Sequence, residues 1–164
     1  MAKDGFSMSN RAQTPEIIED AKTLTVDDCG KLLVLDSAGG LVLTLPSCAS
    51  ALAGWNCDIL IRTAATTGNT YKISTAGSGS GVDGAGTDIY IGGVEIVADV
   101  KAQLTANSQA FAANGTSNDH MNLTFKTRGG QAGGSVRLVT DGNLWYVTGQ
   151  LIGSGTFVTP FADA

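Results

Sequence analysis

The chain has 164 residues, which suffices for one domain with a real hydrophobic core. Only 15% of the residues are charged, the formal net charge is −5, and the ten Lys and Arg residues are scattered singly, which argues against a nucleic-acid partner. No apolar run approaches the roughly 20 residues that span a bilayer, and the first residues lack the apolar core of a signal peptide. We therefore expect synthesis in the cytoplasm and no membrane partner.

The first 21 residues are polar and turn-prone and differ in composition from the remainder of the chain. Thr14 and Pro15 are suited to cap a single helical turn, because the missing N–H of proline is unpaired at that position anyway. We divide the chain into an N-terminal arm, residues 1–21, and one β domain, residues 22–164. A disordered arm is the alternative for the first segment.

Strand signals begin in Thr23 to Pro46, where two strand-like runs are joined by a glycine turn and closed by a proline. In the second run Leu41, Leu43 and Leu45 share one face. Short apolar runs bounded by turn residues predict strands at 23–26, 31–35, 41–45, 56–62, 70–74, 89–91, 94–98, 120–127, 136–140 and 144–148.

The rest of the chain favours sheet as well. Gly134 to Gly149 has two runs around a turn at 140–143, and its adjacent Trp145 and Tyr146 must point to opposite faces of a strand. Residues 98–113 are alanine-rich enough for a helical turn or two, although their spacing is irregular, and the glycine-rich segments 75–86 and 127–135 read as long loops. The predicted fold is all-β: an antiparallel β-sandwich or open β-barrel, jelly-roll-like or tulip-like, with an N-terminal arm and long Gly-rich loops.

Candidate nucleophiles and metal ligands are few. Cys29, Cys48 and Cys57 have no paired spacing and no histidine nearby in sequence, so we expect free thiols packed as small hydrophobes, with an intermolecular bridge as the alternative. His120, the only histidine, follows Asp119, but the chain has no G-x-S-x-G nucleophile elbow. We expect no catalytic residue and no metal site.

Two motifs match cofactor patterns in letters only. Gly79 to Gly84 reads G-x-G-x-x-G, yet strand and turn residues come after it where a dinucleotide site needs a helix. Gly84 to Tyr90 resembles one turn of a calcium-binding glycine-aspartate repeat, but there is no second copy to stack on it. We read both as loops and expect no cofactor.

Two longer patterns resemble a known family. T-L-T-x-x-D-x-G-K-x-x-x-L-D-x-A-G-G-x-x-x-T-L-P at Thr23–Pro46 and D-G-x-x-W-Y-V-x-G at Asp141–Gly149 resemble small virion proteins of tailed bacteriophages, over roughly Lys22 to Gly149. Cys29 departs from this pattern, which more often has serine or another small residue there. Among such proteins are capsid decoration (cement) proteins and modules of tail fibres and spikes.

The resemblance implies a viral structural protein, a homotrimeric cement protein on the capsid surface that binds the major capsid protein and bridges coat subunits. In this interpretation Pro15, Ile17 and Ile18 contact the coat or a neighbouring subunit, while Phe157 and Phe161 form the trimer seam; a tail that only covers the core is the alternative for the last two. A tail-fibre or spike module that binds host-surface carbohydrate predicts exposed aromatic and amide side chains in a groove on the loops. An enzyme requires His120 within hydrogen-bonding reach of a nucleophile or carboxylate.

Overall fold

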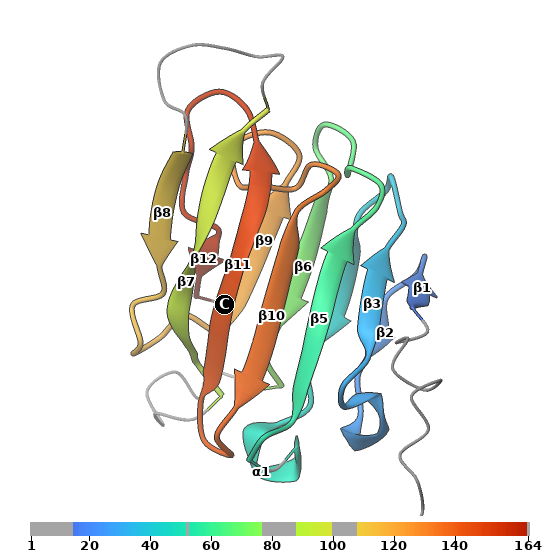
Figure 1. Cartoon of the computed structure of the whole chain (residues 1–164), viewed down its shortest axis with the longest axis vertical. Helices are drawn as coiled ribbons and strands as arrows, with labels where there is room; N and C mark the ends of the chain where they lie inside the picture. The colour runs from blue at the N-terminus through green and yellow to red at the C-terminus, as the bar shows by residue number, and fades with distance from the viewer. Residues whose placement is uncertain (1–14, 52, 77–87, 100–107, 164) are drawn as a thin grey trace, which may run out of the picture.

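The computed structural model describes residues 15–51, 53–76, 88–99 and 108–163. They form two mixed β-sheets that face each other (Figure 1). The larger sheet has seven strands, in the order β1 (Glu16–Ile18), β3 (Leu32–Leu35), β5 (Asn56–Ile61), β10 (Ser135–Thr140), β11 (Trp145–Gly153), β7 (Tyr90–Ala98) and β8 (Ser108–Ala112). The smaller sheet has five, in the order β12 (Phe161–Ala162), β9 (His120–Thr124), β6 (Thr70–Ser74), β4 (Leu41–Thr44) and β2 (Lys22–Thr23).

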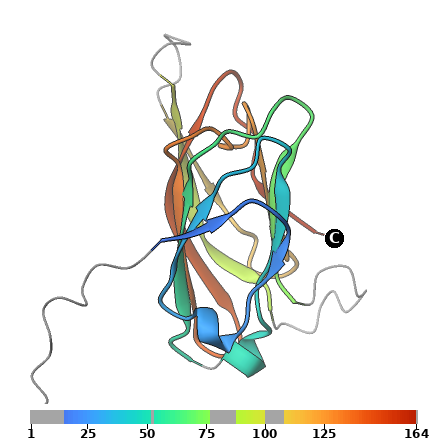
Figure 2. The same cartoon turned by 90° about the vertical axis from the view of Figure 1, so that its right-hand side faces the viewer.

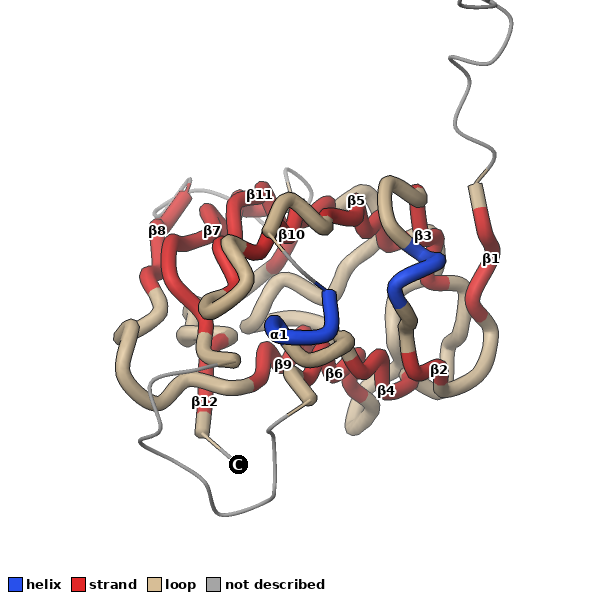
Figure 3. Tube along the Cα trace, turned by 90° about the horizontal axis from the view of Figure 1, so that it is seen from below, coloured by secondary structure: helices blue, strands red, loops and turns tan. Residues whose placement is uncertain are grey.

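Helix is confined to two short pieces in the described ranges, a 3-10 turn at Val26–Asp28 and α1 at Cys48–Ala51. Seen from below, α1 lies at one end of the molecule between the two rows of strands (Figure 3). Cys48 and Ala51 are buried there, so α1 covers that end of the core. In the described part of the chain no helix is long and apolar enough to cross a membrane.

The first six strands alternate between the two sheets, and the chain crosses from one layer to the other after each of them (Figure 2). Within each sheet, the strands that follow one another along this part of the chain therefore run in the same direction: β1, β3 and β5 are parallel neighbours, as are β2, β4 and β6. The expectation of antiparallel sheets is therefore wrong, because a winding chain returns to each sheet in the same sense. Antiparallel pairing appears later, as in the β10–β11 hairpin.

The core lies between the sheets and follows the predicted alternation. Leu41, Leu43 and Leu45 are buried on the inner face while Val42 points outward. Trp145 is fully buried and meets Trp55 edge to face at 5.3 Å between ring centroids, whereas Tyr146 is exposed on the other face, so the prediction that this pair points in opposite directions is confirmed.

Three segments differ from the sequence expectations. Residues 16–18, assigned to the arm and to a helical turn, form strand β1 in the larger sheet, and Ile18 is buried in the core. The alanine-rich segment forms no helix where it is described, since 108–112 is strand β8. Residues 89–91 and 94–98 are predicted as two strands, but residues 90–98 form the single strand β7, which continues through Gly92 and Gly93.

Candidate functional site

The outer face of the larger sheet carries an apolar row at its β1 end. The strand register places Ile17 beside Val34 and Val34 beside Leu60, with all three side chains on the outer face. Ile17 is 50% exposed, Leu60 is half-buried, and Val34 is covered between them. We call Ile17, Val34 and Leu60 the apolar row.

A shallow depression lies next to the apolar row, over β3, β5, β10 and β11. The register aligns Leu32, Asp58, Arg137 and Thr148 across these four strands, and Ser135 pairs with Leu60. All of these residues line the depression. The apolar row thus has one acidic and one basic side chain beside it, a mixture of apolar and polar surface that is common in protein–protein contacts.

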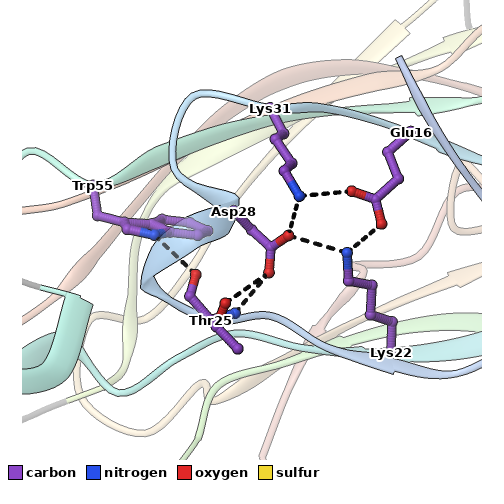
Figure 4. A network of polar contacts seen from close by, with 6 residues as sticks. All are labelled: Glu16, Lys22, Thr25, Asp28, Lys31 and Trp55. Carbon is purple, nitrogen blue, oxygen red and sulfur yellow. Dashed lines mark hydrogen bonds and ion pairs between the residues drawn. The ribbon is translucent and has the colours of Figure 1, made fainter. Parts of the chain in front are cut away.

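A cluster of four charged residues fixes the β1 end of the molecule (Figure 4). The carboxylate of Asp28 accepts hydrogen bonds from Lys22 Nζ at 3.0 Å and Lys31 Nζ at 2.6 Å. Glu16 on β1 accepts from the same two lysines, at 2.9 Å for Lys31. Each lysine therefore joins both carboxylates, and the four-charge cluster is electrically neutral.

The surroundings of Asp28 favour its ionised form. Its side chain is buried, which alone would raise its pKa, but hydrogen bonds from Lys31, from the Thr25 backbone N–H and from Lys22 outweigh burial and hold the pKa of Asp28 well below its usual range. Hydrogen bonds from Lys22 and Lys31 also lower the pKa of Glu16.

The four-charge cluster is tied to the core by one further bond. Trp55 is buried and its Nε1 donates a hydrogen bond to the carbonyl oxygen of Thr25 at 3.2 Å. Thr25 also holds Asp28, because its N–H and hydroxyl both donate to that carboxylate. The strand β1, the crossing to β2 and the start of β3 are thus one fixed unit, and this unit carries the apolar row.

The five predicted interface residues separate into two groups. Pro15 and Ile17 are exposed at the β1 end. Ile18, Phe157 and Phe161 are 4%, 7% and 5% exposed and belong to the core cluster of the chain itself. Their side chains pack within the chain itself, and Phe157 and Phe161 of the tail contribute to the core.

The open edges of the sheets differ in how they are protected. β1 has three residues between Pro15 and the acidic Glu19–Asp20, and β2 and β12 have two residues each. Short strands, proline and charge all discourage pairing with another strand. β8, sequence SQAFA, has five residues and contains neither proline nor a charged side chain.

His120 and Asp119 form a buried pair. Their side chains meet at 2.8 Å between His120 Nδ1 and Asp119 Oδ1, and each residue is less than a tenth exposed. A carboxylate is thus within reach, as the enzyme alternative requires, but in the described ranges no hydroxyl or thiol bonds to His120. The second oxygen of Asp119 and the hydroxyl of Thr75, its neighbour across the β6–β9 ladder, have no hydrogen-bond partner among the described residues.

All three cysteines are free thiols. Cys48 and Cys57 are buried, and burial is the main cause that raises the pKa of each to about 12, so neither is an activated nucleophile. Cys29 is exposed and does not pack as a small hydrophobe. Over the ranges described, no group of three His, Cys, Asp or Glu side chains is placed to hold a metal ion.

The letter matches to cofactor motifs fall mostly outside the described residues. Gly79 to Gly84 lies wholly outside them, and of the calcium-like segment only residues 88–90 are described. Asp88 accepts a hydrogen bond from the backbone N–H of Cys48 at 2.5 Å. This carboxylate therefore fixes the start of α1.

A second depression lies between the loop before β6 and the end of β9. Its lining comprises residues 67–70 and 124–127, with Phe125 half-buried and Asn69 beside it. Lys126 Nζ stands 5.9 Å from the centre of the Phe125 ring. This depression combines an aromatic ring with an amide, the features expected of the groove of a carbohydrate-binding module.

No family model, no curated protein and no solved structure matches the chain. Of the predicted interface residues, Pro15 and Ile17 are exposed. No sequence pattern indicates the four-charge cluster, whose members are separated by up to 15 residues along the chain. Strand β8 is not predicted either. Its alanines give no alternation of polar and apolar residues, and only Phe111 is half-buried between exposed neighbours.

Proposed function

We propose that the chain is a structural protein of a bacteriophage virion, a capsid decoration (cement) protein made in the host cytoplasm that binds the major capsid protein and bridges coat subunits as a homotrimer. The finer description of its all-β fold, a jelly-roll-like or tulip-like sandwich, belongs to this proposal. The protein acts through its surfaces and not through catalysis.

The observation that carries the proposal is the apolar row on the fixed β1 end. Ile17 is half exposed on a strand that the four-charge cluster holds in place, so its side chain is presented without a large loss of conformational freedom on binding. The adjacent depression adds Leu32, Asp58 and Arg137. The resemblance of Thr23–Pro46 and Asp141–Gly149 to virion proteins gives the class of partner.

Binding to empty, expanded heads of the encoding phage tests the proposal. Purified protein is co-sedimented with these heads and, separately, with host cell envelopes. We expect saturable binding to heads, no binding to envelopes, and at least a roughly tenfold loss of head affinity in Ile17→Lys, because a lysine there would be desolvated at the contact.

Val158→Lys is the matched control. Val158 is also a β-branched residue with 40% exposure, and its N–H donates to the carbonyl oxygen of Thr127, beyond the end of β9 in the smaller sheet. It should bind heads like the unmodified protein. Equal binding by both variants would reject the apolar row as the contact, and failure of the unmodified protein to bind heads would reject the decoration role.

A tail-fibre or spike module that binds carbohydrate is the second candidate. The depression around Phe125 and Asn69 favours it, because sugars stack on aromatic rings and bond to amides. Envelope binding that Phe125→Ala abolishes, without head binding, would support this function over decoration.

A further inference from the structure

We infer that β8 is a self-association edge, which pairs antiparallel with β8 of a second copy about a twofold axis through Ala110. The inference does not depend on the capsid role proposed above. It rests on the direction of the backbone groups of β8, the sequence of this strand and its position at the end of the larger sheet.

The backbone direction is set by the ladder with β7. The N–H of Ala113 donates to the carbonyl oxygen of Gly92 at 2.9 Å, so the backbone N–H and C=O groups of Ala113 point toward β7. Alternate residues of an antiparallel strand make their backbone hydrogen bonds on the same side, so the N–H and C=O groups of Phe111 and Gln109 also point toward β7. The N–H and C=O groups of Ser108, Ala110 and Ala112 therefore point away from the sheet.

These three residues are spaced symmetrically around Ala110. In a twofold antiparallel pairing, Ala110 lies opposite Ala110 of the second copy, and Ser108 lies opposite its Ala112. Each such pair exchanges two backbone hydrogen bonds, so every outward-facing group of β8 is satisfied. The larger sheet then continues from one copy into the other.

The side chains favour a second copy as the occupant. β8 has no charged residue, so pairing with itself brings no like charges together. The nearest charge across the ladder is Glu95, which is opposite Ala110 on β7. Its counterpart in the second copy would be three strand spacings away, about 14 Å, which exceeds the screening length in physiological salt.

Packing on the inner face fixes the position of β8 before any pairing. Phe111 and Ala113 pack against the core cluster, while Ser108, Gln109, Ala110 and Ala112 are exposed. The strand is therefore rigid on its bonded side and open on the other, and its alanines leave room for a partner strand. In the proposed homotrimer, the three β8 strands of one trimer pair with the three of a second trimer, so the twofold contacts join two trimers.

Disulfide cross-linking tests both the partner and the register. Ser108→Cys and Ala112→Cys are made separately in a Cys29→Ser background, which removes the exposed native thiol. In the inferred pairing, position 108 of one copy lies about 5.5 Å from position 112 of the other between Cα atoms, within disulfide reach. Two cysteines at position 108 are about 14 Å apart, out of reach.

We therefore expect mild oxidation to give covalent dimers in a mixture of the two variants and few or none in either variant alone. Ala132→Cys, an exposed loop position, is the control for random collision and should stay uncross-linked with either variant. Equal cross-linking of single variants and mixture would overturn the inferred register, and no cross-linking in the mixture would overturn the pairing.

A second variant measures the contact without cysteines. Ala110→Pro removes an outward N–H and leaves the bonds to β7 in place, while Ala110→Ser keeps the N–H as the control. Light scattering should show that Ala110→Pro has half the mass of the unmodified protein, with the far-ultraviolet circular dichroism unchanged. An unchanged mass would overturn the inference.

The same measurement separates this inference from the homotrimer. A trimer for Ala110→Pro and twice that mass for the unmodified protein would support both. A monomer for Ala110→Pro and a dimer for the unmodified protein would support the β8 pairing and reject the trimer. Loss of coat-protein binding by Ala110→Pro, with no change in self-association, would identify the coat as the occupant of β8 and overturn the pairing.

Discussion

Tyr71 shows how one buried polar atom connects distant parts of this chain. The residue is fully buried on β6, and its hydroxyl accepts a hydrogen bond from the N–H of Ser37 at 2.9 Å. The carbonyl oxygens of Ser37 and Thr63 lie at 2.6 and 2.7 Å, and the single hydroxyl proton is donated to one of them. The strand at 70–74 was predicted, but this contact spans 34 residues and has no local sequence signal.

Tyr71→Phe should lower the free energy of unfolding by about 2 kcal/mol, because it leaves the half-buried Ser37 N–H without its acceptor and removes the hydroxyl that lies 2.7 Å from the Thr63 carbonyl oxygen. Urea unfolding followed by tryptophan fluorescence measures the change. Tyr146→Phe is the matched control: its hydroxyl bonds to Asp141 at the surface, so its loss should cost less than about 0.5 kcal/mol. Equal effects would show that burial of the Tyr71 hydroxyl is unimportant.

At the scale of elements, strand β7 depends on two adjacent glycines. Gly92 has a φ of +100°, and a Cβ there would lie 2.3 Å from the carbonyl oxygen of Val147 on β11. A Cβ on Gly93 would lie 2.4 Å from the carbonyl oxygen of Phe111 on β8. The glycines therefore let both neighbouring strands approach β7, whereas in the sequence they look like a break between two strands.

Gly93→Ala should destabilise the protein by about 2 kcal/mol and loosen β8. The added methyl group collides with backbone atoms of β8, which cannot move aside as a flexible side chain can. Hydrogen exchange should accelerate at Gln109 and Phe111, whose amides face β7. Gly39→Ala is the control, because its Cβ would meet only the Ser37 side chain at 3.9 Å. Unchanged exchange in β8 would contradict this role of Gly93.

Local pattern accounts for most of the strands and for the buried faces. Leu41, Leu43 and Leu45 alternate with polar or outward residues, and the turn at 140–143 forms as predicted, with Asp141 Oδ1 accepting from the N–H groups of Asn143 and Leu144 at 2.8 Å. The missed strands β1, β8 and β12 are short or alanine-rich and give no periodic signal. Strand direction depends on how the chain crosses between layers, which no local pattern records.

At the scale of the whole molecule, ionic contacts decide where the folded body begins. Composition separates residues 1–21 from the rest, yet Glu16 is held by Lys22 and Lys31 and belongs to the body. Its partners lie on different segments of the chain. Such a boundary is set by tertiary contact and not by the polarity of the local sequence.

The four-charge cluster predicts loss of stability in acid. The folded-state pKa of Asp28 lies well below the unfolded value of about 4, so its contribution is present above pH 4 and is lost as the pH falls below that value. Asp28→Asn should reduce the free energy of unfolding at pH 7 by about 2 kcal/mol. Solvent weakens the two ion pairs, because both lysines are partly exposed, and this amount includes that weakening.

Thermal unfolding between pH 7 and pH 2 measures this dependence. The difference between the unmodified protein and Asp28→Asn should shrink as the pH falls from 4 to 2. Asp27→Asn changes the exposed neighbouring carboxylate and should behave like the unmodified protein at every pH. A constant difference between Asp28→Asn and the unmodified protein across this range would rule out ionisation of Asp28 as the cause.

The order of strands in the larger sheet also bears on how the protein is made. β10 and β11 are late in the chain, yet they occupy the middle of the sheet between β5 and β7. While a ribosome is still producing them, β1, β3 and β5 cannot be joined to β7 and β8, and the edges of β5 and β7 that later receive the hairpin have no partner strands. The larger sheet therefore closes only after synthesis has passed Gly153, and the nascent chain needs protection from aggregation until then.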